Sequence, residues 1–483
     1  MSHGASALGA SARSPGVWHR FRANVGRIAT LAWPVFIGQI AVLAFSTVDT
    51  VMAARYGALD LAALAVGGAI YISVFVGLMG VVLAVGPITG QLFGARKLPE
   101  AGRQLHQALW LALGLSVIGC TALLFPQPFL TLARAQPEVA DKVRGYLNAL
   151  AFALPPALLF TAFRGFNTAV SRPKIVMALQ LGALLLKVPL TALLVFGGGV
   201  DTPWGRLAVA EQGAPGCGIA TAVVMCLQLL AAWLVLQRDP FYDRFGLRGR
   251  GISPPHRASI AELLRLGIPM GLAIGVEVTG FTFMAFFISR IGATPVAGHQ
   301  IAVNLVSLMF MVPLSLANAT STLVAQRIGA VDPTDARRIG WHGLLIGVAL
   351  AAAMGCAVYL LREPILGAYT RDPLIVAAAM PLLAWVVVFH IADAAQTVAG
   401  FVLRAYRVTT VSLVIYVAAL WGVGLAGGYA LAFDSTGLAP RSLQGALGFW
   451  SAATAGLTLA ALALSGFLVW MLRRQKRDLA QAR

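Results

Sequence analysis

Residues 31–67 read LAWPVFIGQIAVLAFSTVDTVMAARYGALDLAALAVG, and residues 266–302 read LGIPMGLAIGVEVTGFTFMAFFISRIGATPVAGHQIA. Each stretch begins with Leu-x-x-Pro, at Pro34 and at Pro269, and continues as a long apolar run, 29–54 or 266–289, that holds one carboxylate, Asp49 or Glu277. Apolar runs of about 20 residues are long enough to cross a membrane as a helix. These stretches therefore predict spanning helices and an internal repeat, whose offset is the separation of the two prolines.

Composition extends this prediction to the whole chain. The 483 residues are 59% hydrophobic and 11% charged, whereas a soluble domain carries about 25% charged residues. Lipid admits only helices or closed barrels, and barrel strands are short and alternating. The runs here are long and rich in Ala and Leu, so we predict an all-α polytopic membrane protein. Its twelve expected spans are 29–54, 64–91, 104–125, 143–163, 175–197, 215–237, 266–289, 296–325, 340–361, 374–403, 410–433 and 446–472.

The distribution of Lys and Arg indicates how the chain is oriented in the membrane. Net charge is +18, and the positive-inside rule places Lys and Arg in cytoplasmic loops. With the N-terminus inside, 26 of the 36 Lys and Arg fall in cytoplasmic segments and 9 in external ones. We therefore expect both termini in the cytoplasm and contact with anionic lipid headgroups, and we do not expect nucleic-acid binding. We read the first residues as a cytoplasmic tail rather than a signal peptide.

Motifs of other protein classes are missing from the sequence. The four cysteines form no CxxC pair, so neither a disulfide framework nor a zinc site is indicated. No P-loop and no HExxH motif occurs. We therefore expect a transporter rather than an enzyme, with no cofactor, and energy from an ion gradient.

The repeat reaches beyond the prolines. RYGA at 55–58 returns as RIGA at 290–293, and QLFGA at 91–95 returns as QRIGA at 326–330, each at the offset of the two prolines. Six spans per repeat bring both halves into the membrane from the same side, and a substrate cavity is expected between such halves. The predicted organisation is a tail at 1–28, an N-lobe at 29–237, a linker at 238–265, a C-lobe at 266–472 and a tail at 473–483.

Three acidic residues lie inside the predicted spans: Asp49, Glu277 and Asp393. A carboxylate at a helix centre in the membrane costs at least about 2.5–3.5 kcal/mol, so such residues commonly mark ion or substrate pathways. Glu277 and Asp393 belong to the same half and could share a proton or hold a monovalent cation such as Na⁺. The alternative is that hydroxyls and backbone groups satisfy these acids and that they have no role in transport.

Lys187, in LLLKVPL, is the only basic residue well inside a predicted span. A buried ammonium needs a partner. One hypothesis is that Lys187 and Asp49 lie together in the N-lobe and neutralise one another. The other is that Lys187 extends to the membrane surface or faces water.

Other polar and aromatic residues within the spans are weaker candidates. An intramembrane His or amide can be a hydrogen-bonding contact between helices or part of a proton relay, and the sequence leaves both open. An aromatic residue can line a cavity or simply face lipid. The candidates for the substrate cavity are Lys187, Gln39, Asn167, Phe281, His299, Gln300, Asn304, His390 and Gln396.

Several of these motifs resemble one family. VDTVMAARYG at 48–57, VAGHQIAVNL at 296–305 and IADAAQTVAGFVLRAY at 391–406 are similar to helices of the multidrug and toxic compound extrusion (MATE) family, in its NorM-like branch. The resemblance covers about residues 25–475. It implies two six-helix lobes around a V-shaped central cavity in the bacterial inner membrane.

The same resemblance implies a function. It implies an antiporter that exchanges cationic and amphipathic compounds for Na⁺ or H⁺, with Glu277 and Asp393 as the C-lobe acids of the cation site and Asp49 as the N-lobe acid. Because one chain contains both halves, we expect a monomer. Lys187 and Thr191 stand where many members have Asn, which puts the coupling role of Asp49 in question. There are three alternatives. A flippase or exporter of lipid-linked precursors or metabolites would need a basic cavity, whereas the spans hold three acids and one lysine, and the repeat within one chain argues against an ion channel. Nutrient uptake by the same fold stays open.

Overall fold

The computed structural model describes residues 17–133, 136–202, 205–249, 251–435, 437 and 439–481. Within these residues, twelve helical segments are long and apolar enough to cross a membrane, so the predicted count is confirmed. The only strands among the described residues are β1 (Gly198–Thr202) and β2 (Gly205–Val209), which form one antiparallel hairpin. The fold is therefore all-helical in its membrane part, as predicted.

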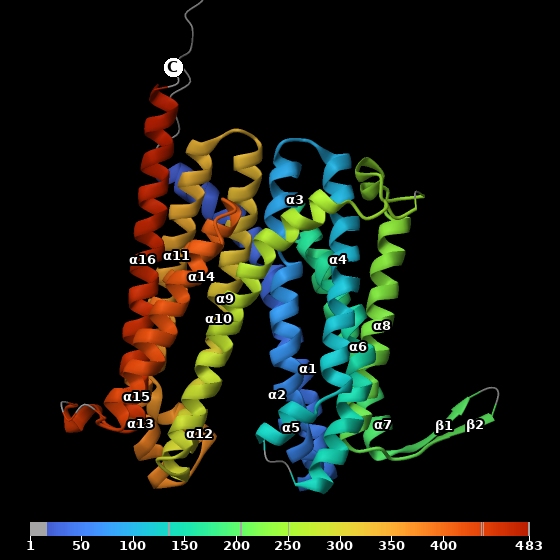
Figure 1. Ribbon diagram of the computed structural model, residues 1–483, viewed down its shortest axis with the longest axis vertical. Helices are drawn as coiled ribbons and strands as arrows, with labels where there is room; N and C mark the ends of the chain where they lie inside the picture. The colour runs from blue at the N-terminus through green and yellow to red at the C-terminus, as the bar shows by residue number, and fades with distance from the viewer. Residues whose placement is uncertain are drawn as a thin grey trace, which may run out of the picture.

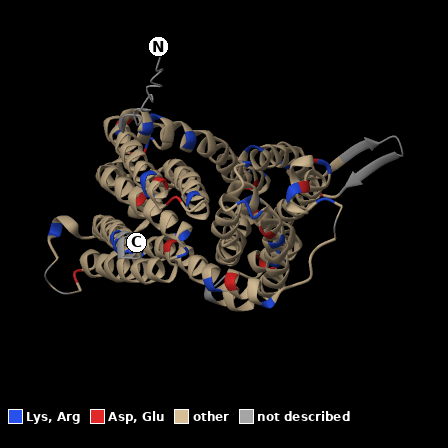
Figure 2. Ribbon diagram, turned by 90° about the horizontal axis from the view of Figure 1, so that it is seen from above, with Lys and Arg blue, Asp and Glu red and all other residues tan. Residues whose placement is uncertain are grey.

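The helices form two bundles that lie side by side (Figures 1 and 2). The first helix begins and the last helix ends at the same end of the molecule, here called the termini end (Figure 1). The first bundle contains α1 (Val17–Tyr56), α2 (Ala58–Val82), α3 (Val85–Gly94), α4 (Leu98–Leu124), the short α5 (Gln127–Ala133), α6 (Pro137–Ala169), α7 (Pro173–Phe196) and α8 (Ala214–Arg238). The second contains α9 (Arg257–Ser289), α10 (Ala293–Gly329), α11 (Pro333–Leu360), the short α12 (Arg362–Tyr369), α13 (Pro373–Ala405), α14 (Thr410–Tyr416), η2 (Val417–Ala426), α15 (Gly427–Ala432) and α16 (Ala446–Gln481).

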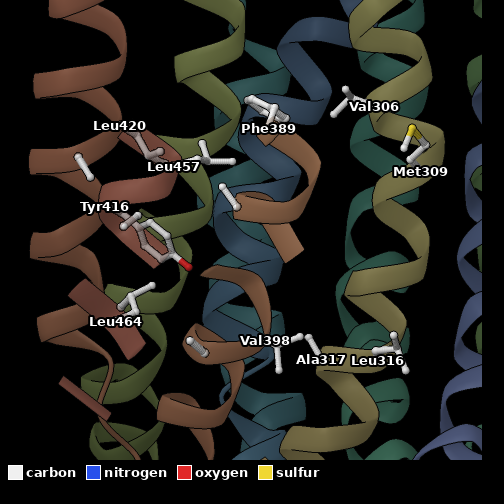
Figure 3. Packing of buried hydrophobic residues seen from close by; sticks show 14 of the residues in the cluster. Val306, Met309, Leu316, Ala317, Phe389, Val398, Tyr416, Leu420, Leu457 and Leu464 are labelled. Carbon is white, nitrogen blue, oxygen red and sulfur yellow. The ribbon is translucent and has the colours of Figure 1, made fainter. Parts of the chain in front are cut away.

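A separate buried apolar cluster fills each bundle. The first cluster is built mainly from α2 to α8, and the second mainly from α10 to α16. Figure 3 shows part of the second cluster, where Val306 of α10 lies near Phe389 of α13, and Ala317 of α10 lies beside Val398 of α13. The two repeats of the sequence are thus two lobes, each with its own core.

The first helix of each lobe begins on the core of the other lobe. Ile28 and Leu31, near the start of α1, are buried in the second cluster. Leu263 and Leu266, near the start of α9, are buried in the first cluster. These two pairs occupy equivalent positions of the repeat, so the exchange is reciprocal. It joins the lobes at the termini end.

Backbone geometry preserves the repeat more strictly than the side chains do. Arg96 and Val331 have φ of 59° and 58°, and Ser171 and Arg407 have φ of 64° and 61°. A left-handed residue is a common way to end a helix, although glycine is the usual choice. The first pair lies at the offset of the two prolines, and the second pair differs from it by a single position. The same helix ends recur in both lobes, as the pseudo-symmetry of the sequence predicts.

The helices are longer than the predicted spans. The predicted tail at 1–28 already contains the beginning of α1, and α16 continues to Gln481. Hydropathy marks only the membrane-crossing part, whereas helical hydrogen bonds continue into polar sequence until a cap or proline ends them. The span predicted at 64–91 is interrupted between Val82, the end of α2, and Val85, the start of α3. Pro87, in the first turn of α3, lacks the N–H that a continuous helix would need.

The polar linker between the lobes is held against α4. Gln107 Nε2 donates to the carbonyl of Pro254 at 3.0 Å, and its Oε1 accepts from the backbone N–H of His256 at 2.7 Å. Trp110 Nε1 donates to the carbonyl of Ser253 at 2.9 Å. The linker that leads into the second lobe is therefore hydrogen-bonded to a helix of the first lobe.

The eleventh spanning segment contains a π-helix, η2, between α14 and α15. Such segments are rare and occur mostly at functional sites. Its neighbour α16 approaches it through Gly456, where an added Cβ would lie 2.5 Å from the carbonyl oxygen of Ala419 and 3.0 Å from the backbone nitrogen of Gly424. The close approach of α16 therefore depends on the missing side chain at Gly456.

We predict that Gly456→Ala destabilises the protein by about 1–3 kcal/mol, because the new methyl group collides with backbone that cannot move away. Gly466→Ala is the matched control in the same helix, since an added Cβ there meets no atom within 4 Å. Melting temperatures in detergent measure both variants. Equal melting temperatures for the two would contradict this account of the packing.

Candidate functional site

The N-lobe carboxylate is paired with the buried lysine. Asp49 lies in α1 and is 7% exposed, and Lys187 lies in α7 and is 0% exposed. Lys187 Nζ is 2.8 Å from Asp49 Oδ1 and 2.9 Å from Oδ2. The hypothesis that the two charges neutralise one another is confirmed by this geometry. The alternative, a lysine that reaches water or the membrane surface, is wrong because the side chain has no exposed surface.

Further groups complete the surroundings of the lysine. Its ammonium also donates to the hydroxyl of Thr221 on α8, and that hydroxyl donates to the carbonyl of Cys217 at 2.8 Å. The ring of Phe45 lies 5.4 Å from Nζ. Lys187 therefore occupies the position beside Asp49 that an external cation would have to take.

The two C-lobe acids are brought together by one amide. Gln396 Nε2 donates to Asp393 Oδ1 at 2.9 Å and approaches Glu277 Oε1 at 3.5 Å. Asp393 and Gln396 are 4% and 1% exposed, and Glu277, on α9, is half-buried. Spacing of three residues on α13 places Asp393 and Gln396 on one helix face. No basic side chain is hydrogen-bonded to either acid among the described residues.

The donor set suits a proton or a small monovalent cation. Both carboxylates lie within 3.5 Å of one nitrogen, so their charges repel unless a proton or cation is shared between them. Gln396 Oε1 is buried and has no hydrogen-bond donor. Carboxylate and amide oxygens are ligands for hard cations. The described residues contain no group of three or more His, Cys, Asp or Glu that could hold a metal ion, so any cation here has at most two carboxylate ligands.

An apolar cavity adjoins Glu277. It is small, with a volume of about 40 Å³, and is partly open to its surroundings. Its lining comes from α9, α13, η2 and α16, and Glu277 is its only charged lining residue. Phe281 and Phe389 stack edge to face across it with ring centroids 5.9 Å apart. Leu420 and Leu457, labelled in Figure 3, form part of another wall.

The π-helix is bonded directly to the helix that carries Glu277. Trp421 Nε1 donates to the carbonyl of Val276 at 3.1 Å. Leu420 and Gly424, on the same π-helix, line the cavity. A change of helical register in η2 would therefore act on the cavity wall and on the backbone next to Glu277.

The structure separates the remaining cavity candidates. His299 Nδ1 accepts from Trp450 Nε1 at 3.2 Å, which fits a contact between helices. Asn304 Oδ1 accepts from Tyr369 at 2.8 Å, near α12. Asn167 is fully buried and binds Tyr242 of the linker at 2.6 Å, away from the C-lobe cavity.

Four candidates have no such partner across the helices. His390 lies in α13 three residues before Asp393, is 0% exposed, and neither ring nitrogen is hydrogen-bonded. Gln300 is exposed and Gln39 half-buried. Phe281 is in the cavity wall. Their roles in transport stay predictions.

Two buried charges were missed by the sequence analysis. Asp60 was assigned to a polar loop, but it lies in the first turn of α2, is 3% exposed, and accepts from Lys142 at 2.8 Å and from the backbone N–H of Ala214 at 2.7 Å. Arg404 was assigned to a loop, but it is in the last turn of α13 and is 8% exposed. Arg404 is three helical turns from Asp393, a spacing that could have placed it on the same face.

Twelve spanning helices in two repeated lobes, with carboxylates held inside the bundles, define a polytopic membrane transporter. The family model described as MatE matches residues 34–193 and 269–430. The chain belongs to this MATE family of transporters, as the sequence motifs predicted.

Curated relatives agree along the full length of the chain. The chain is 38% identical over 455 residues to "Probable multidrug resistance protein NorM" of Aromatoleum aromaticum, which covers 94% of this chain and 95% of that protein. It is 35% identical over 446 residues to "Multidrug resistance protein PmpM" of Pseudomonas aeruginosa, with 92% and 91% covered.

Solved structures share the fold at low identity. The crystal structure of the eukaryotic MATE transporter AtDTX14 matches with a TM-score of 0.83 at 19% identity, covering 95% of this chain and 98% of that one. An outward-facing structure of a multidrug resistance MATE family transporter of the MOP superfamily matches with a TM-score of 0.81 at 17% identity, covering 96% and 99%.

The buried ion pair makes a prediction about stability. Removing one partner leaves an unpaired charge in the apolar bundle, which typically costs about 3–5 kcal/mol. We expect Asp49→Asn and Lys187→Gln each to lower the melting temperature and the yield of folded protein. The double variant should be more stable than either single variant, because no isolated charge is left. A double variant no better than the singles would show that the pair does not determine N-lobe stability.

Proposed function

We propose that this protein exports cationic and amphipathic compounds across the bacterial inner membrane in exchange for Na⁺ or H⁺. One observation carries the proposal: two carboxylates share one buried amide, and one of them, Glu277, lines an apolar cavity. The apolar lining would bind the hydrophobic part of a substrate, and Glu277 would attract its positive charge. The names of the relatives, multidrug resistance proteins, support export of this kind.

The coupling mechanism follows from competition for the same charge. A proton or Na⁺ at Glu277 and Asp393 removes the attraction for a cationic substrate, and departure of the ion restores it. The ion shifts the conformational equilibrium only if its affinity differs between the two states. A tenfold difference in affinity corresponds to about 1.4 kcal/mol, which one carboxylate contact can supply.

The N-lobe has a different part in this proposal. Asp49 already has Lys187 as its counter-ion, so a second cation would meet the ammonium at the same carboxylate. We propose that the C-lobe pair performs the coupling and that Asp49 contributes mainly to N-lobe structure in this conformation. This agrees with the question that Lys187 raised about the coupling role of Asp49 in the sequence.

Orientation, lobe boundaries and assembly belong to the same proposal. The excess of Lys and Arg at the termini end favours a cytoplasmic location for both termini. The substrate pathway would then run between the lobes, with 29–237 and 266–472 as their membrane parts. One chain contains both halves, which supports a monomer as the transporting unit.

The alternative of a flippase for lipid-linked precursors requires a basic cavity for anionic headgroups. The single charged residue in the cavity wall is acidic. The structure therefore offers no observation in favour of that alternative.

We expect Glu277→Gln and Asp393→Asn each to abolish gradient-driven efflux while the protein still inserts and folds, because a neutral amide cannot exchange a proton or compete for Na⁺. Glu363→Gln, at an exposed acid of α12, is the control. Resistance to cationic dyes in cells and dye efflux from vesicles measure the effect. Undiminished efflux by both variants would falsify the coupling role.

The coupling ion can be identified with reconstituted vesicles. Efflux of a fluorescent cation is measured under an imposed Na⁺ gradient at uniform pH, and then under a pH gradient without Na⁺. We expect one gradient to accelerate efflux by tenfold or more, and the C-lobe variants to lose that acceleration. Equal efflux with no gradient at all would contradict antiport.

A further inference from the structure

A glutamine of the first lobe reaches into the second. Gln91 lies on α3, and its Nε2 donates to the carbonyl of Ala405 at 2.8 Å. Ala405 is the last residue of α13, the helix that also carries Asp393. The final carbonyls of a helix have no partner within the helix. This bond therefore satisfies a free backbone group across the boundary between the lobes.

The repeat places the same contact in the opposite direction. Gln326, on α10 of the second lobe, donates through Nε2 to the carbonyl of Ala169 at 2.7 Å. Ala169 is the last residue of α6 in the first lobe. Gln326 is the repeat equivalent of Gln91, and the two acceptors are equivalent to within one position. Each lobe thus contributes one glutamine and one helix end, and we call this pair of contacts the glutamine latch.

The backbones at the latch are as close as glycine permits. An added Cβ on Gly94 would lie 1.9 Å from the carbonyl oxygen of Gln326, and an added Cβ on Gly329 would lie 1.9 Å from that of Gln91. The QxxG spacing of both repeats is therefore used in one crossing of α3 and α10, where each glycine touches the other lobe's glutamine.

The two contacts of the glutamine latch differ in the bonds that lie beside them. Gln326 makes a second bond across the boundary, to the hydroxyl of Ser171 at 2.8 Å. The residue equivalent to Ser171 is Arg407, which forms an ion pair with Glu262 of α9 instead. The start of α9 is buried in the first lobe's core. The Gln91 side therefore has an ion pair beside it, whereas the Gln326 side depends on its own two bonds.

We propose that Gln91 and Gln326 are positioning residues that hold the lobes together at the termini end, and that both contacts must break when the transporter opens on that side. The consequence for transport rests on the proposed function, whereas the conformational role does not. Because Gln91 binds the end of the helix that carries Asp393, the latch also connects the lobe boundary to the coupling site.

The test compares Gln91→Met, Gln326→Met and the double variant, in which methionine keeps the length of the side chain but donates no hydrogen bond. Ser321→Ala is the matched control. Ser321 Oγ donates to the carbonyl of Phe401 at 2.8 Å, which is also a bond from α10 to α13, but within one lobe. If the Met variants fold poorly, Gln91→Glu and Gln326→Glu are used instead. They remove the N–H donor but keep a polar side chain of the same shape.

The readout is the distance between the lobes at the termini end. Spin labels are attached through Arg103→Cys on α4 and Arg338→Cys on α11, exposed positions at equivalent places in the two repeats, after the four native cysteines are changed to Ala. Electron-resonance distance distributions are recorded in lipid nanodiscs without substrate. This measurement needs neither a transported compound nor a coupling ion, so it can succeed even if the proposed function fails.

We expect the double variant to gain a population at longer distance, with the ratio of open to closed forms raised about tenfold or more, since each lost bond is worth severalfold. Gln326→Met should shift the ratio more than Gln91→Met, because the ion pair at Arg407 remains beside the latter. Ser321→Ala should leave the distribution unchanged. An unchanged distribution in the double variant, or an equal shift in the control, would overturn the proposal.

Discussion

A carboxylate inside an apolar helix bundle has to be neutralised, and each lobe does this differently. In the N-lobe the counter-ion is a side chain of the protein itself. Lys187 Nζ lies within 2.9 Å of both carboxylate oxygens of Asp49. In the C-lobe Glu277 and Asp393 share a neutral amide, which cannot cancel their charge. A mobile ion is needed only where no resident one is bound. The functional asymmetry of a pseudo-symmetric molecule follows from this difference.

The helix that carries Glu277 also connects the lobes. The start of α9 is buried in the N-lobe core at Leu263 and Leu266, and Glu277 lies about 16 Å farther along the same helix. The opposite exchange occurs in α1, which begins on the C-lobe core and carries Asp49 to Lys187 in the N-lobe. A change of charge at either site therefore acts on a helix that contacts both lobes. This gives a physical path between ion binding and the boundary of the lobes.

The cavity wall next to Glu277 is built from unusual backbone. The wall includes the π-helix η2, a rare backbone form, and its Trp421 donates to the carbonyl of Val276. Gly424 of the π-helix and Gly456 of α16 bring two backbones into contact where side chains would separate them. The apolar cavity thus has one wall of packed aromatic residues and another made of closely packed backbone.

The sequence by itself determined the number of spanning helices, the repeat and the three acids within the predicted spans, because hydropathy is a local property. It offered Asp49 as one possible partner for Lys187, and the tertiary structure decided that the two side chains are paired. The sequence did not reveal the burial of Asp60 and Arg404, which lie at helix ends where hydropathy marks the boundary poorly. Only the tertiary structure decided that the first helices exchange ends, that one amide joins Glu277 to Asp393, and that Gln91 and Gln326 bind helix ends of the opposite lobe. Most of these contacts join residues that are far apart in the chain, and a pattern of neighbouring residues carries no information about which distant backbone group will be free to accept a hydrogen bond.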